Sequence, residues 1–175
     1  MNMINVLKFL PLTVFIVYAR LNGMTDVAWR EAFILGGICT LIVVAVQLYK
    51  KVTFDRLMLG VNLFLLVGAV AFLGELYGIL MLYGTYKGAA LLACVGIVGL
   101  MTTLFTDARF IGVDVVGKTA LKKRYSFMLL LVTMLAFVWA VMMNQQGLVV
   151  SAIVPFIILR VMYEEFGKKL EFNNN

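Results

Sequence analysis

The sequence predicts an all-α membrane protein, a polytopic transmembrane bundle of five or six helices that forms a single domain over residues 1–175. Hydrophobic residues make up 63% of the chain and charged residues 14%, whereas a soluble globular protein is only about half apolar. The mean hydropathy of +1.02 agrees with this. Runs such as residues 41–46 and 129–132 are apolar on every side and lack the alternation of barrel strands, so we expect membrane helices.

Six apolar segments are candidate spans, since about 20 residues are needed to cross the hydrocarbon. The predicted segments are residues 4–19, 32–49, 57–73, 88–105, 125–143 and 148–162. The first is short and contains Lys8 and Pro11, so we expect a kinked span, a re-entrant piece or an interfacial helix. Residues 17–19 resemble a signal-peptide cleavage site, but we expect this segment to be retained.

The orientation follows from the basic residues, because lysine and arginine resist translocation. Of the fifteen lysines and arginines, Arg20, Arg30 and Lys87 fall on one side if the segments alternate, which leaves twelve on the other. The connections after the second and fourth segments, and the C-terminus, are therefore predicted to be cytoplasmic. The net charge of +6 is explained by this bias, so the bilayer is the predicted partner and nucleic acid is not.

The connections predict which helices are neighbours. Residues 144–147 form a four-residue polar turn, and residues 50–56 are nearly as short, so each should join two antiparallel helices. Residues 106–124 are longer and mix apolar with charged side chains. We expect this stretch to lie in the interface of the cytoplasmic leaflet.

Glu75 is the first candidate for a functional site, because an ionised carboxylate in an apolar run costs several kcal/mol unless it is paired or reaches water. If the third helix ends near Leu73, Glu75 is a solvated cap at the outer interface. If the helix continues toward Tyr83, Glu75 lies within the membrane and would bind a cation or carry a proton. Lys87 is then its candidate counter-ion, so Glu75, Lys87 and Tyr83 form a predicted polar or ion site.

A second candidate is the basic stretch before the fifth segment. Its residues are Arg109, Lys118, Lys122, Lys123 and Arg124. They would contact anionic lipid headgroups or a partner protein, with a contribution of about 1 kcal/mol per basic residue at a membrane surface. The alternative is that they only determine the topology.

Small residues four apart, as at Gly74 and Gly78 and at Gly84 and Gly88, let helix backbones approach closely in lipid. They would serve packing within the chain or a homo-oligomer.

The sequence has no histidine, no phosphate-binding glycine loop and no nucleophile with a plausible base, so it predicts no enzyme, no metal and no cofactor.

Residues 8–15, followed by Tyr18, resemble the start of the bacterial intracellular septation protein A family (YciB), whose members begin with a similar F-L-P-L-x-x-F stretch. The order of the later segments and the chain length are also similar. The two differ around residues 122–127, where the family tends to place a leucine-proline turn and then a tryptophan and an asparagine. The resemblance implies an inner-membrane protein of cell-envelope maintenance, associated with division and elongation proteins and lacking catalytic residues.

Three functions stay open at this stage. The first is an inner-membrane scaffold that engages other envelope or division proteins through its helix faces and basic stretch. The second is a small oligomeric channel or transporter that uses Glu75. The third is a membrane effector or sensor of a stress or defence system, with a cytoplasmic partner docking on residues 106–124.

Overall fold

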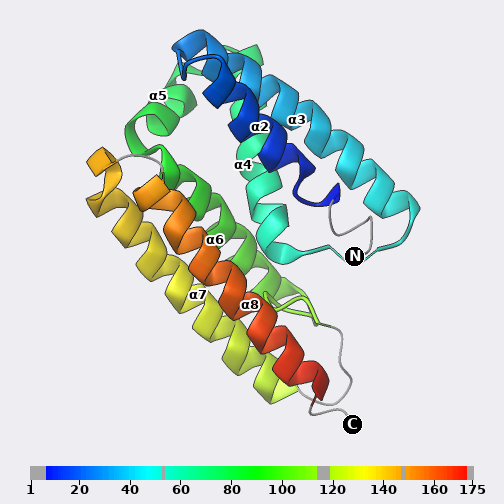
Figure 1. Ribbon diagram of the computed structural model, residues 1–175. Helices are drawn as coiled ribbons and strands as arrows, with labels where there is room; N and C mark the ends of the chain where they lie inside the picture. Colours follow the sequence, from blue (N-terminus) through cyan, green and yellow to red (C-terminus); the bar gives the residue numbers. More distant parts are fainter. Residues whose placement is uncertain (1–6, 53, 114–118, 147–148, 173–175) are drawn as a thin grey trace. The chain divides into compact units, whose positions relative to one another are not determined.

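The computed structural model describes residues 7–52, 54–113, 119–146 and 149–172, and these residues form helices and no strand (Figure 1). The α-helices are α2 (Leu10–Leu21), α3 (Asp26–Tyr49), α4 (Arg56–Leu73), α5 (Tyr77–Tyr86), α6 (Gly88–Phe105), α7 (Thr119–Met142) and α8 (Val154–Phe172). Two short pieces, η1 (Asn144–Gln146) and η2 (Val149–Ile153), lie between α7 and α8. The chain divides into two compact units, Met1–Thr85 and Tyr86–Asn175, a division that the sequence did not predict.

Four helices of the described chain, α3, α4, α6 and α7, are long and apolar enough to cross a membrane. The shorter helix α2 is apolar but has only 12 residues. The all-helical class is therefore confirmed, and the structure supports four candidate spans where the sequence predicted five or six.

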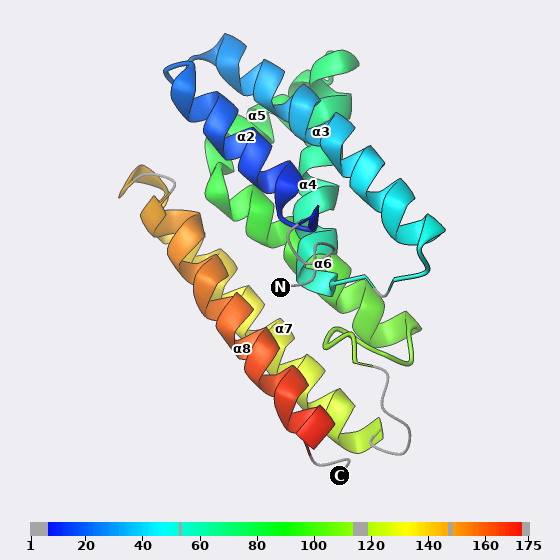
Figure 2. The ribbon, with the colours of Figure 1, turned by 45° about the vertical axis from the view of Figure 1, so that its right-hand side comes forward.

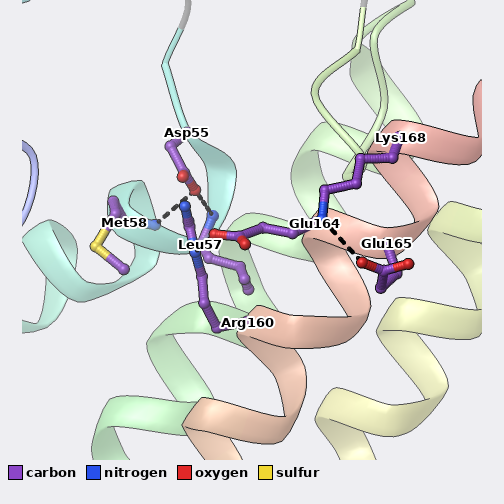
Figure 3. A network of polar contacts seen from close by, with 7 residues as sticks. All are labelled: Asp55, Leu57, Met58, Arg160, Glu164, Glu165 and Lys168. Atoms are coloured by element: carbon purple, nitrogen blue, oxygen red, sulfur yellow. Dashed lines mark hydrogen bonds and ion pairs between the residues drawn. The ribbon is translucent and has the colours of Figure 1, made fainter. Parts of the chain in front are cut away.

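Capping residues explain where α3 and α4 begin. The Thr25 hydroxyl accepts a hydrogen bond from the backbone N–H of Ala28 at 3.2 Å, so α3 starts earlier than the predicted residue 32. The Asp55 carboxylate accepts bonds from the N–H groups of Leu57 and Met58 at 3.1 and 3.3 Å, which starts α4 close to its predicted boundary (Figure 3).

Pro11 lies in the first turn of α2, where its missing N–H costs no helical hydrogen bond. It therefore lies at the start of α2, after a turn at Lys8 and Phe9, while the beginning of the predicted segment 4–19 lies outside the described residues. Near the end of α2, the Tyr18 hydroxyl donates to the Glu31 carboxylate of α3 at 2.6 Å. This bond gives the acidic residue near the start of α3 a partner.

In the first unit, α3 packs against both α2 and α4 around a cluster of aromatic rings. The aromatic cluster consists of Phe15, Trp29, Phe33, Phe64, Phe72 and Tyr83. Phe33 stands at its centre and lies directly over Gly68, where a Cβ would come within 2.3 Å of the ring. Gly37 likewise faces Ala69 so closely that an added Cβ would lie 2.7 Å from the alanine Cβ. Glycine is favoured at both positions because a side chain of the facing helix occupies the place of its missing Cβ: the Phe33 ring at Gly68 and the Ala69 methyl group at Gly37.

In the second unit, α7 packs against α6 and α8, and α7 and α8 run side by side along their length (Figures 1 and 2). The turn between them is followed by η2, a π-helical piece. Pro155 has no N–H to donate to the carbonyl of Ser151 four residues earlier, so the widened turn is expected just before it. Here Gly88 faces Ala152, whose Cβ would lie 2.5 Å from an added Cβ.

The structure describes residues 106–113 and 119–124 of the predicted interfacial stretch, whose location at a membrane stays a prediction. Phe110 and Ile111 are completely buried, because Phe110 packs on Gly99 of α6. α7 begins at Thr119, six residues before the predicted segment 125–143. Part of the predicted stretch is therefore a folded-in turn, and its end is the first two turns of a helix.

Candidate functional site

Glu75 lies in the turn between α4 and α5, outside both helices. α4 ends at Leu73, and the next residue, Gly74, caps it. Glu75 has a φ of +52°, a left-handed conformation that ends a helix, and its side chain is exposed. The Tyr77 hydroxyl is 3.4 Å from its carboxylate, the outer limit of a hydrogen bond. Of the two predicted positions for Glu75, the structure gives the one at the end of the third helix.

Tyr83 has a structural role in the first unit. Its ring stacks on Phe64 at 4.9 Å and meets Phe33 edge-on at 5.5 Å. Its hydroxyl donates to the backbone carbonyl of Phe64 at 3.0 Å. Tyr83 thus fastens α5 to α4, and its hydroxyl and the carboxylate of Glu75 have different partners within the same unit.

Lys87, the third residue of the predicted polar site, belongs to the second unit. It is exposed and has a φ of +40° in the one-residue break between α5 and α6. This positive φ, which is unusual for a non-glycine residue, comes directly before Gly88, where α6 begins and packs against Ala152. The structure therefore gives Lys87 a place in a helix junction.

Three segments of the second unit are fastened together at the end where α7 begins and α8 finishes. The buried hydroxyl of Ser126 accepts a hydrogen bond from the N–H of Ile111 at 3.1 Å. Phe110 meets Tyr163 of α8 edge-on at 6.5 Å. Tyr125 stacks on Phe166 with ring centres 4.8 Å apart. We call this region, formed by residues 106–113, 119–126 and 163–170, the basic end.

The basic end brings together most of the predicted lipid or partner contacts. Lys123 and Arg124 are exposed near the start of α7. Lys122, which directly precedes them, is only 7% exposed. Arg109 is half-buried, and its guanidinium donates to the carbonyl of Thr103 at 3.3 Å. The remaining predicted residue, Lys118, lies outside the described residues.

Sequence reasoning treated the three consecutive basic residues alike, although a signal separates them. The buried residues of α7 recur at the helical spacing of three and four, and all but Leu129 are small or polar: Lys122, Ser126, Leu129, Thr133, Ala136 and Ala140. Such a stripe is typical of a helix interface within lipid. It places Lys122 on the packed face, and it places Lys123 and Arg124 outside it.

Two ion pairs on α8 belong to the same region (Figure 3). Arg160 donates to Glu164 at 2.7 Å, and Lys168 donates to Glu165 at 2.9 Å. The hydrogen bond and charge of Lys168 lower the pKa of Glu165, and the same bond raises the pKa of Lys168. The Lys168–Glu165 pair is solvent-exposed and contributes little stability, whereas Arg160 in the other pair is only 23% exposed.

In the part of the chain that the structure describes, no three histidine, cysteine, aspartate or glutamate side chains gather as a metal site would require.

A Cβ added at Gly78 or Gly84 would meet nothing within 4 Å, while Gly88 is packed inside its unit. These contacts lie within one chain, so the homo-oligomer through small residues stays a prediction.

Comparison of the chain with protein-family models, with curated proteins and with solved structures gives no match. The resemblance to the septation protein A family stays a prediction.

Proposed function

We propose that this chain is a multi-pass protein of a bacterial inner membrane and acts there as a scaffold of cell-envelope maintenance or septation. In this proposal one or both of the predicted segments 4–19 and 148–162 join the four candidate spans, which gives five or six crossings. The C-terminus and the basic end lie in the cytoplasm, because lysines and arginines concentrate on that side. Other envelope or division proteins are its proposed partners.

The observation that carries the proposal is the combination of four apolar helices with the charged surface of the basic end. The apolar residues on the outside of α7 need lipid or another helix as their neighbour. The exposed Lys123 and Arg124 stand where such a helix would leave the membrane. A protein of this kind recruits partners by helix contacts and by surface charge, and it needs no catalytic residues.

The position of Glu75 favours the scaffold over the channel or transporter. A transport carboxylate is expected within a helix, facing a water-filled path. Glu75 instead follows the end of α4 and is exposed. Replacement of Glu75 by Gln in reconstituted vesicles should therefore leave cation and proton flux unchanged, and a flux that this variant abolished would restore the transport alternative.

Co-purification tests the scaffold proposal directly. Tagged wild-type chain, extracted from bacterial membranes in a mild detergent, should recover division or envelope-synthesis proteins. Charge reversal in a Lys123→Glu and Arg124→Glu variant should reduce that recovery, whereas the matched Lys50→Glu and Lys51→Glu variant changes the same number of charges elsewhere. Recovery of no envelope or division protein by the wild-type chain would refute the proposal.

A further inference from the structure

α7 has two unlike faces along its whole length. One face is the buried stripe of small and polar residues that packs within the second unit. The other is exposed and apolar, with Phe127 63% and Leu131 52% exposed. Lys123 and Arg124 lie at the start of this exposed face.

The two cations stand directly beside exposed apolar side chains. Lys123 precedes Phe127, and Arg124 precedes Met128, by four residues, a spacing that puts the Cβ atoms about 5–6 Å apart. Leu131 and Val138 follow Arg124 at intervals of seven, so they lie on nearly the same line of the helix. At 1.5 Å per residue this line is roughly 21 Å long, with a positive charge at one end and apolar surface over the rest.

The charges at this place do not serve the helix itself. Lys123 and Arg124 are the fifth and sixth residues of α7, so they lie beyond its first turn, the part in which a charge interacts with the helix dipole. Within the described chain, neither Lys123 nor Arg124 makes an ion pair. The nearby Glu164 and Glu165 are already paired on α8 with Arg160 and Lys168. An anion from outside the chain would therefore give these two cations a partner.

We propose that Lys123 and Arg124 bind the phosphate of an anionic phospholipid, whose acyl chain lies along the exposed apolar face of α7. A phospholipid has the same order of parts as this face, with a charged group followed by a hydrocarbon chain. Lys169, which follows the stacked Phe166 on α8 by three residues, adds to the positive charge near the start of α7. The inference uses the membrane location of the proposed function, and it does not depend on the scaffold role.

The test is a lipid titration of the purified full-length chain in neutral detergent micelles. Native mass spectrometry gives the affinities for phosphatidylglycerol and for phosphatidylcholine with identical acyl chains. We expect tighter binding of phosphatidylglycerol, and a loss of roughly 10- to 30-fold in a Lys123→Ala and Arg124→Ala variant, as two surface charges imply. Phosphatidylcholine binding should not change.

The control is the Lys50→Ala and Lys51→Ala variant, which removes two exposed lysines at the end of α3. It should bind phosphatidylglycerol within about twofold of the wild type, because its charges belong to another unit. Equal losses in the two variants, or equal binding of the two lipids by the wild type, would overturn the proposal. So would displacement of the lipid by inorganic phosphate at the same concentration, since the acyl chain would then contribute nothing.

Two further measurements keep the test interpretable. If the Lys123→Ala and Arg124→Ala variant unfolds, phosphatidylglycerol binding to the wild type is measured at increasing salt concentration instead. Salt screens exposed charges, so the binding should weaken. Salt-independent binding would count against the proposal. A variant that keeps its lipid affinity but loses co-purifying proteins would assign the surface to a protein partner, which also overturns the lipid assignment.

Discussion

α4 of the first unit and α7 of the second are similarly apolar but are used differently. In α4, 56% of the most apolar stretch is buried, compared with 28% in α7. α4 brings Phe64, Phe72 and Gly68 to an aromatic cluster, whereas α7 packs mainly through small or polar residues and leaves most of its large apolar side chains exposed. Apolar composition indicates that exposing a helix to water is unfavourable, but it does not show which helices or lipids are its neighbours. The same kind of substitution should therefore have different effects on stability in the two units.

The same substitution in the two units gives the largest expected difference. Phe33→Ala removes a ring that has five other rings between 4.7 and 6.3 Å away, and should lower the free energy of unfolding by about 3–5 kcal/mol. Phe127→Ala removes an exposed ring of α7 and should cost less than about 1 kcal/mol. Thermal unfolding in detergent micelles measures both. Equal losses would show that the units are packed alike.

Close helix approach in the first unit is tested by adding one methyl group. Gly68→Ala places a Cβ against the ring of Phe33, which other rings hold in place, so we expect a loss of about 1–3 kcal/mol. Gly78→Ala, in the exposed helix α5, has open space and serves as the matched control. It should be neutral or slightly stabilising, because alanine favours a helix. A stable Gly68→Ala variant would mean that Phe33 can move aside at little cost.

The buried turn of the second unit depends on one hydroxyl. Ser126→Ala leaves the N–H of Ile111 buried without its acceptor, and should cost about 1–2 kcal/mol and speed hydrogen exchange over residues 106–113. Thr133→Val is the control, because the Thr133 hydroxyl bonds only to the Leu129 carbonyl of its own helix. Its loss should be smaller, about 0.5 kcal/mol. Unchanged exchange in Ser126→Ala would indicate that Phe110 alone holds the turn.

The smallest expected effect concerns the exposed pair on α8. Because Lys168 lowers the pKa of Glu165, the pair stabilises the fold at pH values above the ordinary glutamate pKa. This contribution is lost as the pH falls through the lowered pKa of the folded state. Lys168→Gln should raise the pKa of Glu165 toward its ordinary value, as followed by carbon-13 NMR, while Lys169→Gln should change it less. An unaltered Glu165 pKa in both variants would mean that the pair does not persist in solution.

Helix positions were largely predictable from the sequence, because uninterrupted apolar runs and polar breaks identify them. The predicted segments 57–73 and 88–105 agree closely with α4 and α6. The starts of α3 and α7 were placed too late, because Arg30, Glu31 and Lys122 to Arg124 were assigned to connections. A helix continues through charged residues wherever a cap such as Thr25 starts it earlier.

The candidate sites were less predictable, because they depend on contacts between distant residues. Tyr83 was assigned to a polar site, yet its ring and hydroxyl are bound to Phe64 of another helix. The sequence left open where the third helix ends, and α4 ends at Leu73, before Glu75; the depth of Glu75 in a membrane stays a prediction. Phe110 and Ile111 were placed at the interface, although Gly99 and Ser126 provide space and a hydrogen-bond acceptor for them inside the unit.

The sequence by itself determined that this protein is helical and strongly apolar. Long apolar runs form helices because their backbone hydrogen bonds must be satisfied within each segment. Only the tertiary structure decided that Lys122 is buried while Lys123 and Arg124 are exposed, and that α4 is enclosed while α7 presents an apolar face. The first property depends on composition along the chain. The second depends on which helix faces meet, and that is set by steric fit between residues far apart in sequence.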